Sequence, residues 1–319
     1  MRTNEKSKIC VATVAYNNPG ELSGLFESLS LQTRPINGIV VVDNSESEDM
    51  AKANRAVFDE FAKAVSWSVF VPLYRNTGSA GGFRRAMELA HKENFDWIWM
   101  LDQDGLLEGD CLERMAAHLD EAKILCARVL SAEDRKSDLA FTKKINFWGR
   151  LLPIAQEGDY PVKVSLFCTH GTLLGRDAID AVGYYDDENF FFRWEDLDYG
   201  YRVHAKGISA LLIRDAIAYH PERAAPKASD VYPSGLAGKF VFYIRNIFPL
   251  FLPCDWRLDS ESDVLSHNSY KAIIRKHIKG YKFWGALFFS VFFLLYAKCR
   301  GAAIPLGKTI RDYIALRKS

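Results

Sequence analysis

Short apolar runs alternate with amphipathic stretches over roughly the first hundred residues of the chain. The apolar runs have the length and composition of buried strands, which we predict at 8–16, 39–42, 67–72 and 97–102. Between them, apolar residues recur at helical spacing, as in Leu22, Leu25, Phe26 and Leu29, and predict helices at 19–31, 50–64 and 83–91. This alternation predicts an α/β fold whose mostly parallel sheet is flanked by helices on both faces.

The second half of the chain has a less regular pattern. It predicts a strand at 166–174, a helix at 195–206 that ends before Gly207, and a strand from 209 that runs on to His220. From about residue 234 onward the pattern becomes helical and basic. We therefore expect a sheet-based domain at 1–233, followed by a helical C-terminal region at 234–319.

Charge divides the chain in the same way. The 319 residues carry a net charge of +1, yet residues 264–319 hold eleven Lys and Arg against one acid, or +10, which leaves −9 for the first 263. A nucleic-acid-binding protein would carry positive charge on its folded domain, so that class is excluded. Six cysteines without any CxxC spacing indicate reduced thiols rather than a zinc site or a disulfide framework. No signal peptide is visible, and we expect a cytoplasmic protein.

One segment of the basic region indicates contact with a membrane. Residues 283–297 form an uncharged, aromatic run of 15 residues with basic residues on both sides. A spanning helix needs about 20 residues, so a helix that lies in the interface with anionic lipid fits better. A buried core or oligomer helix and a true transmembrane helix are the alternatives. We expect peripheral binding at the inner face of the cell membrane.

Two carboxylates, Asp102 and Asp104, follow the predicted strand at 97–102 directly. Parallel sheets bind ligands at the carboxyl ends of their strands, and carboxylate oxygens there suit Mg²⁺ or Mn²⁺ beside a pyrophosphate. The alternative is an ordinary acidic surface turn. His220 ends a strand-like run and would complete a Mn²⁺ shell if the fold brings it to the acidic pair, although a lone histidine is usually structural.

A glycine-rich loop is predicted at 75–82, before a helix that opens with Phe83, Arg84 and Arg85. Glycines permit close approach of the backbone, and a helix N-terminus favours an anion. The segment is neither a Walker loop nor a dinucleotide fingerprint, and many such loops simply turn the chain.

A third group of acids, Glu195, Asp196 and Asp198, follows an aromatic block at 190–194. A carboxylate against aromatic walls is partly desolvated, which suits a general base. The alternative is that these acids cap a helix, and the spacing of Asp198 and Arg202 predicts an intrahelical ion pair.

Five motifs together resemble the family-two inverting glycosyltransferases of the GT-A fold, which is Rossmann-like, over residues 8–250. They lie at 11–17, 41–45, 76–82, 101–105 and 190–202. The chain is most similar to the branch that contains bacterial galactofuranosyltransferases and rhamnosyltransferases.

The resemblance implies a role for each matching residue. Donor-binding positions are Thr13, Tyr16, Asp43, Asn76, Gly78, Gly81, Gly82, Asp102 and Gln103. Asp102, Asp104 and His220 match the ligands of Mn²⁺ or Mg²⁺, and Asp196 matches the catalytic base. Trp194, Glu195 and Asp198 match positions that hold the acceptor or orient the base.

The expected function is transfer of a sugar from a nucleotide-sugar donor to a lipid-linked cell-surface glycan, with inversion. Gln103 between the two aspartates is similar to the rhamnosyl branch, whereas the segments at 80–85 and 194–196 are similar to the galactofuranosyl branch. UDP-galactofuranose is favoured as donor over dTDP-rhamnose. A sugar-nucleotide pyrophosphorylase would carry its glycine-rich signature after the first strand, where this chain has Tyr16-Asn17-Asn18-Pro19. A non-catalytic nucleotide-sugar-binding or scaffold protein would have lost the acids. The acceptor, the linkage and the oligomeric state are left open.

Overall fold

The computed structural model describes residues 7–139, 141–145, 151–158, 160–192, 194–222 and 276–277. Nearly all of them belong to one compact unit, 1–145 with 152–222. The boundary expected at 233/234, the C-terminal helices and the apolar run at 283–297 lie outside the described residues. Among the helices that are described, none combines the length and the apolar character needed to cross a membrane.

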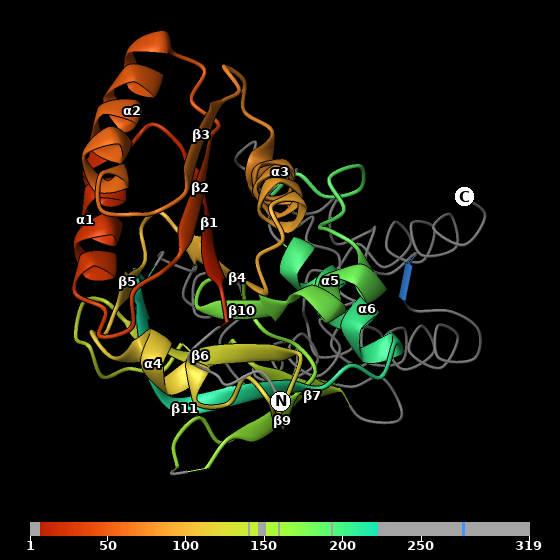
Figure 1. The fold of residues 1–319 in the computed structure, drawn as a ribbon. Coiled ribbons are helices and arrows are strands. Elements are labelled where there is room, and N and C mark those ends of the chain that lie inside the picture. Colours follow the sequence, from red (N-terminus) through yellow and green to blue (C-terminus); the bar gives the residue numbers. More distant parts are fainter. Residues whose placement is uncertain are drawn as a thin grey trace, which may run out of the picture. The chain divides into compact units, whose positions relative to one another are not determined.

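The first hundred residues form the predicted alternation of strands and helices (Figure 1). The strands are β1 (Ile9–Ala15), β2 (Gly38–Asp43), β3 (Ser68–Pro72) and β4 (Trp97–Asp102). The helices are α1 (Pro19–Ser30), α2 (Glu48–Ala62) and α3 (Gly78–Lys92). β1 pairs in parallel with β2 and β4, and β2 pairs in parallel with β3. The predicted parallel sheet is confirmed for this half.

The second half adds strands that pair in both directions. Its elements are β5 (Leu106–Leu107), α4 (Cys111–Ala116), β6 (Ile124–Ser131), β7 (Lys143–Ile145), β8 (Leu151–Pro153), β9 (Val162–Val164), β10 (Thr172–Gly175), α5 (Arg176–Val182), α6 (Glu195–Ala205) and β11 (Ala210–His220). The helix predicted at 195–206 and the strand that runs to His220 are confirmed. The pattern did not indicate β6, although it lies near the centre of the sheet.

The strand predicted at 166–174 is wrong over most of its length. Only β10 is extended, because the chain turns immediately before it: the Thr172 N–H donates to the Thr169 carbonyl at 3.2 Å, and Gly171 adopts a φ of +78°. An apolar run of this kind does not reveal a turn that depends on one glycine. The turn lies beside the end of β4, so His170 within it contacts Asp102.

The order of the strands places the ends of β4 and β11 at one edge of the sheet. The order is β3-β2-β1-β4-β10-β6-β11-β5, and β9 pairs with β11. β10 runs antiparallel to both β4 and β6, and β11 runs parallel to β6. Two reversals restore the direction of β4, so β11 ends at the same edge as β4, β1 and β2. The first residues of β10 lie at that edge as well.

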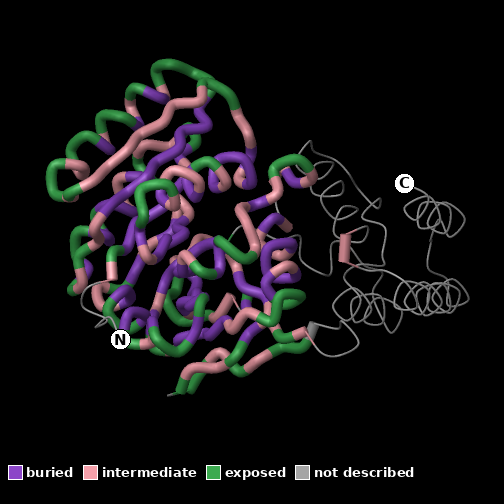
Figure 2. The backbone as a smooth tube through the Cα atoms, turned by 45° about the vertical axis from the view of Figure 1, so that its right-hand side comes forward, coloured by how far each residue is buried: buried purple, intermediate pink, exposed green. Residues whose placement is uncertain are grey.

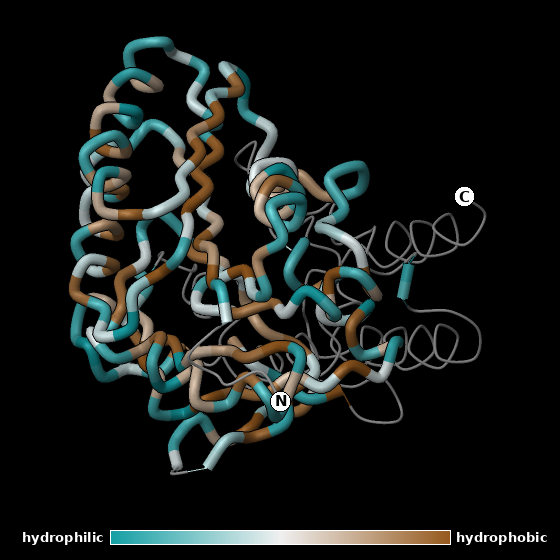
Figure 3. The backbone as a smooth tube through the Cα atoms, in the orientation of Figure 1, coloured by the Kyte–Doolittle hydropathy of each residue, from teal (hydrophilic) through white to brown (hydrophobic). Residues whose placement is uncertain are grey.

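Two apolar layers cover the faces of this sheet (Figures 2 and 3). One layer joins alternate side chains of β1 and β4 to α1, α2 and α4, and includes Leu25, Phe58 and Met115. The other joins the remaining side chains to α3, α5 and α6, and includes Met87 and Tyr199. The strands are apolar on both faces for this reason, whereas the outward sides of α1 and α2 are hydrophilic.

The helix expected to open at Phe83 begins five residues earlier, at Gly78. Glycine is required at two positions of this first stretch. Gly78 has a φ of +70°, and a Cβ there would lie 1.8 Å from the Phe191 carbonyl oxygen. A Cβ on Gly82 would lie 2.6 Å from the side chain of Val14 in β1. The glycines therefore allow α3 to pack tightly against β1 and the 187–192 segment.

Candidate functional site

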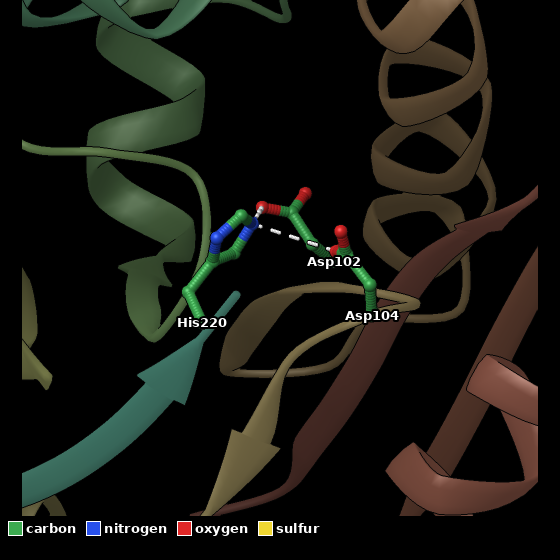
Figure 4. Close-up of side chains that lie close together, drawn as sticks. All are labelled: Asp102, Asp104 and His220. Atoms are coloured by element: carbon green, nitrogen blue, oxygen red, sulfur yellow. Dashed lines mark ion pairs between the residues drawn. The ribbon is translucent and has the colours of Figure 1, made fainter. Parts of the chain in front are cut away.

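The side chains of Asp102, Asp104 and His220 form one cluster at the carboxyl edge of the sheet (Figure 4). His220 Nε2 lies 3.5 Å from Asp102 Oδ2 and 3.4 Å from Asp104 Oδ1. One potential ligand atom of each residue lies within 4.8 Å of the other two. The structure thus brings together the three residues that the family resemblance assigned to a metal.

The electrostatics of this cluster are those of a cation site. Burial disfavours the imidazolium form of His220, but the hydrogen bond to Asp102 and the charges of both aspartates outweigh it and raise the pKa of His220 to about 9. A proton on His220 therefore offsets one of the two negative charges of Asp102 and Asp104. A divalent cation would take the place of that proton, and two carboxylates with one imidazole form a donor set that suits Mn²⁺. These residues fit such an ion.

Gln103, between the two aspartates, bonds to the protein itself. Its Oε1 accepts from the Tyr16 amide at 2.6 Å, and its Nε2 donates to the Tyr16 carbonyl at 3.1 Å and to Glu21 Oε2 at 3.0 Å. Gln103 therefore fixes the backbone of Tyr16, which follows β1. The Tyr16 side chain is 39% exposed and is accessible to a ligand.

The segment before α3 is anchored to the end of β2 by Asn44. The Asn44 amide donates to the Gly78 carbonyl at 2.8 Å, and its oxygen accepts from the Thr77 hydroxyl at 2.8 Å. Asn76 Oδ1 accepts from the Gly78 amide at 2.9 Å. The sequence analysis did not single out Asn44, although its position in the turn after β2 is a signal for such a role.

The expected anion site at the start of α3 is partly filled by protein groups. The Gly78 amide is bound by Asn76 and the Ala80 amide donates to the Phe191 carbonyl at 3.4 Å. Arg84 forms ion pairs with Glu88 and Asp187, and Arg85 pairs with Glu88. Whether Asn76, Gly78, Gly81 and Gly82 contact a donor stays a prediction.

Thr13 in β1 and Asp43 at the end of β2, both expected at the donor base and ribose, are fully buried. Asp43 Oδ1 accepts from the Ser45 amide at 2.8 Å and from the Asn54 side chain at 3.3 Å. Asp43 Oδ2 and Thr13 Oγ1 have no hydrogen-bond partner among the described residues. Asp43 therefore orders the turn after β2, and its contact with a donor stays a prediction.

Helix α6 begins directly behind Trp194, whose φ of +71° lies in a region that bulky residues rarely adopt. Glu195 is 6% exposed, and its Oε1 accepts from the hydroxyl of Ser79 in α3. Glu195 Oε2 is buried without a hydrogen-bond partner in the part of the chain that is described. The sequence analysis missed Ser79, which ties the starts of α3 and α6 together.

Burial perturbs both acids at the start of α6. It raises the pKa of Glu195, and the negative charge of Asp196 raises it further. Burial also raises the pKa of Asp196, opposed by a 2.7 Å hydrogen bond from the Leu197 amide and reinforced by the charge of Asp102. Asp196 ionises before Glu195, so the pair can hold one proton and one negative charge near neutral pH.

Asp198 has a structural partner, as the helical alternative predicted. Its side chain is fully buried, and its Oδ2 accepts from Arg202 Nε at 2.8 Å. Arg202 also donates to the carbonyl oxygens of Val182 and Tyr184, at 2.9 Å each. This ion pair holds α6 against the end of α5 and the residues that follow it. We propose this structural role for Asp198 in place of a contact with the acceptor.

Comparison with known sequences finds a protein family and several relatives that resemble this chain. The profile of Glycosyl transferase family 2 matches residues 10–183. Galactofuranosyltransferase GlfT1 of Mycobacterium tuberculosis is 25% identical over 232 residues, which cover 67% of this chain and 70% of the relative. GlfT1 of Mycolicibacterium smegmatis is 26% identical over 224 residues, with the same coverage.

Solved structures show the same fold. S. aureus TarS superimposes with a TM-score of 0.59 at 14% identity over 98% of this chain, which spans only 55% of that protein. TarS 1–349 in complex with UDP gives a TM-score of 0.58 at 16% identity, covering 98% of this chain and 90% of that one. Mannosyltransferase PcManGT from Pyrobaculum calidifontis, in complex with GDP-Man and Mn²⁺, gives 0.51 at 14% identity, covering 99% and 82%. The fold is GT-A-like.

Proposed function

Because the chain belongs to glycosyl transferase family 2, we propose that it transfers galactofuranose from UDP-galactofuranose to a hydroxyl of a lipid-linked cell-surface glycan. The observation that carries this proposal is the cluster of Asp102, Asp104 and His220 at the carboxyl edge of a GT-A-like sheet. At such an edge, α/β sheets bind their nucleotide ligands. The partly exposed Asp196 lies close enough for the charge of Asp102 to raise its pKa.

In the proposed reaction, Asp196 is the general base. The acceptor oxygen attacks the anomeric carbon while the bond from that carbon to the diphosphate breaks on the opposite face, and the nucleoside diphosphate leaves with the bonding electrons. The acceptor proton passes to Asp196. Its Oδ1 accepts from the Leu197 amide, whereas Oδ2 has no partner among the described residues and is the oxygen we assign to the proton. A single displacement inverts the configuration at the anomeric carbon.

Asp102, Asp104 and His220 would hold a divalent cation, Mn²⁺ or Mg²⁺, which when bound supplies positive charge to the departing diphosphate. Gln103 holds the backbone of Tyr16, and we assign the Tyr16 ring to the nucleotide base. Trp194 and Glu195 are the residues we assign to the acceptor side, next to Asp196. Glu195, whose pKa is raised more than that of Asp196, would be a neutral hydrogen-bond donor there.

Two features of the sequence bear on the identity of the donor. Similarity to the two GlfT1 proteins supports galactofuranose, while Gln103 between the aspartates supports the alternative donor, dTDP-rhamnose. The proposed acceptor is supported by the basic, aromatic segment around 283–297, which would bring the enzyme to a lipid-linked glycan at the inner membrane surface. Deleting the residues after Gly280 should then release the protein from vesicles that contain anionic lipid.

Calorimetric titration with UDP and dTDP, each with and without Mn²⁺, tests the donor and the metal together. Tighter binding of UDP that requires Mn²⁺ is the expected result. Preference for dTDP would favour the rhamnosyl donor. Absence of binding of either nucleotide in the presence of Mn²⁺ would contradict the transferase proposal.

Asp196→Asn tests the base independently of the donor. The variant should bind UDP as the wild type does, because Asp196 contacts the acceptor rather than the nucleotide. Its kcat should fall by about 10²- to 10⁴-fold, the usual contribution of a general base. Weakened UDP binding with unchanged turnover would refute the assignment.

A further inference from the structure

The turn that carries Asp102 and Asp104 is built around a buried imidazole. His170 lies just before β10 and is 1% exposed. Because β10 runs antiparallel to β4, the residues before β10 lie beside the end of β4, and the Gly171 amide donates to the Met100 carbonyl at 3.0 Å. His170 is thereby placed against the residues that follow Met100.

Two contacts join the His170 ring to this turn. The Asp102 amide donates to His170 Nδ1 at 3.2 Å. The turn closes through a 3.1 Å hydrogen bond from the Gly105 amide to the Asp102 carbonyl, and a Cβ on Gly105 would lie 1.9 Å from His170 Cε1. His170 Nε2 is buried and has no hydrogen-bond partner among the described residues. The turn therefore packs closely around the His170 ring, and glycine is needed at position 105 because a larger side chain would clash with the ring.

The same ring also contacts the third residue of the cluster. The ring centroids of His170 and His220 lie 5.7 Å apart, with the planes inclined by 61°. His170 thus contacts the backbone of Asp102 and the ring of His220, and it contributes no ligand atom to the cluster itself. It lies between the ends of β4 and β11, which are separated by β10 and β6 in the sheet.

The hydrogen bond from Asp102 fixes the protonation pattern of His170. A backbone amide can only donate, so Nδ1 must present its lone pair, and the proton of the neutral ring sits on Nε2. A side chain of similar size without an acceptor at this position could fill the space but could not hold the Asp102 amide.

We propose that His170 is a positioning residue for the metal site: its Nδ1 orients the Asp102–Gly105 turn, and its ring spaces that turn from His220. This inference rests on the proposed function, since it assumes that Asp102, Asp104 and His220 bind a divalent cation. Groups that orient metal ligands typically contribute 10- to 100-fold in metal affinity.

The first test is the affinity for Mn²⁺, measured from the electron paramagnetic resonance signal of free Mn²⁺ in the presence of saturating UDP. His170→Phe keeps a buried ring but lacks the acceptor, and should raise the Kd for Mn²⁺ by about 10-fold or more. His170→Asn retains an oxygen near the position of Nδ1 and should recover most of the affinity. His91→Asn is the matched control, because His91 at the far end of α3 also makes two side-chain hydrogen bonds, to Tyr184 and Asp180.

The outcomes separate this inference from the proposed function. If the wild type binds Mn²⁺ and His170→Phe binds it within about twofold, less than ~0.5 kcal/mol, the role of His170 is refuted while the metal site stands. If the wild type does not take up Mn²⁺, both the metal site and the role of His170 are refuted.

A second measurement needs no variant. The ¹⁵N chemical shifts of the wild-type histidine rings should show His170 as the tautomer with its proton on Nε2. A proton on Nδ1 would overturn the inference even if His170→Phe failed to fold.

Discussion

Asp198→Asn offers a direct test of which acid in the 195–198 segment is structural. The Asp198 side chain is fully buried against Arg202, and Arg202 in turn binds the carbonyls of Val182 and Tyr184. Removing one charge of a buried pair leaves the other inadequately compensated and costs about 3–5 kcal/mol. Since a domain is typically stable by only ~5–15 kcal/mol, the midpoint of urea unfolding should shift far to lower denaturant.

The chain offers a matched control in Asp59→Asn. Asp59 forms an Arg–Asp pair with Arg55 at the same helical spacing and a distance of 2.6 Å, but the two side chains are 53% and 52% exposed. An exposed pair contributes about 0.5 kcal/mol or less, so this variant should unfold nearly as the wild type does.

Turnover measured on the same two samples completes the test. Asp198→Asn should retain the KM for the acceptor under conditions in which it is folded. If it instead unfolds like Asp59→Asn while the KM for the acceptor rises sharply, Asp198 contacts the acceptor and the structural assignment is wrong.

Three further predictions follow from the site and its supports. Burial raises the pKa of Asp196 to about 6. Because a general base must be ionised, kcat should rise as the pH increases through about 6. A rise of kcat centred near pH ~4, the ordinary pKa of a carboxyl group, would contradict the burial of the catalytic base. Gln103→Ala removes two hydrogen bonds to the Tyr16 backbone, worth ~1 kcal/mol each. The affinity for UDP, measured by calorimetry, should fall by about 10-fold or more. An unchanged affinity for UDP would exclude Tyr16 from the base site. Gly82→Ala places a methyl group 2.6 Å from the Val14 side chain and should lower the free energy of unfolding by about 1–3 kcal/mol, measured by thermal unfolding. Gly24→Ala in α1 is the control, because the nearest atom there is 3.6 Å away and the substitution should be neutral or stabilising. Equal effects of the two substitutions would mean that α3 can move away from β1.

The local pattern of apolar and polar residues was sufficient to predict the strands and helices of the first half of the fold. The strands β1 to β4 and the helices between them follow from apolar runs and helical periodicity, because each element buries its own repeat against a neighbour close in the sequence. The placement of Asp102 and Asp104 at a ligand-binding edge followed as well, since they come directly after a buried strand. Even here the start of α3 was placed five residues too late, because Gly78 and Gly82 pack against Phe191 and Val14 in contacts that no local pattern contains.

The second half required the tertiary structure. β6 was missed, and the 166–174 strand was wrong, because a turn at Gly171 interrupts an otherwise uniform apolar stretch. The roles of Ser79 and Asn44 depend on partners 116 and 34 residues away, and the burial of Glu195 depends on α3. Such long-range contacts leave no periodic signal in the sequence.

The sequence by itself determined that two acids follow β4, that a histidine ends a later strand, and that carboxylates begin α6. Only the tertiary structure decided that His220 meets Asp102 and Asp104. β10 inserts antiparallel between β4 and β6, and this reversal brings the start of β10, with His170, to the edge where β4 ends. β6 and β11 then run in the direction of β4, which carries His220 to the same edge. The physical reason is that strand order depends on pairing between distant segments, and the hydrophobic pattern of a buried strand is the same whichever neighbour it pairs with.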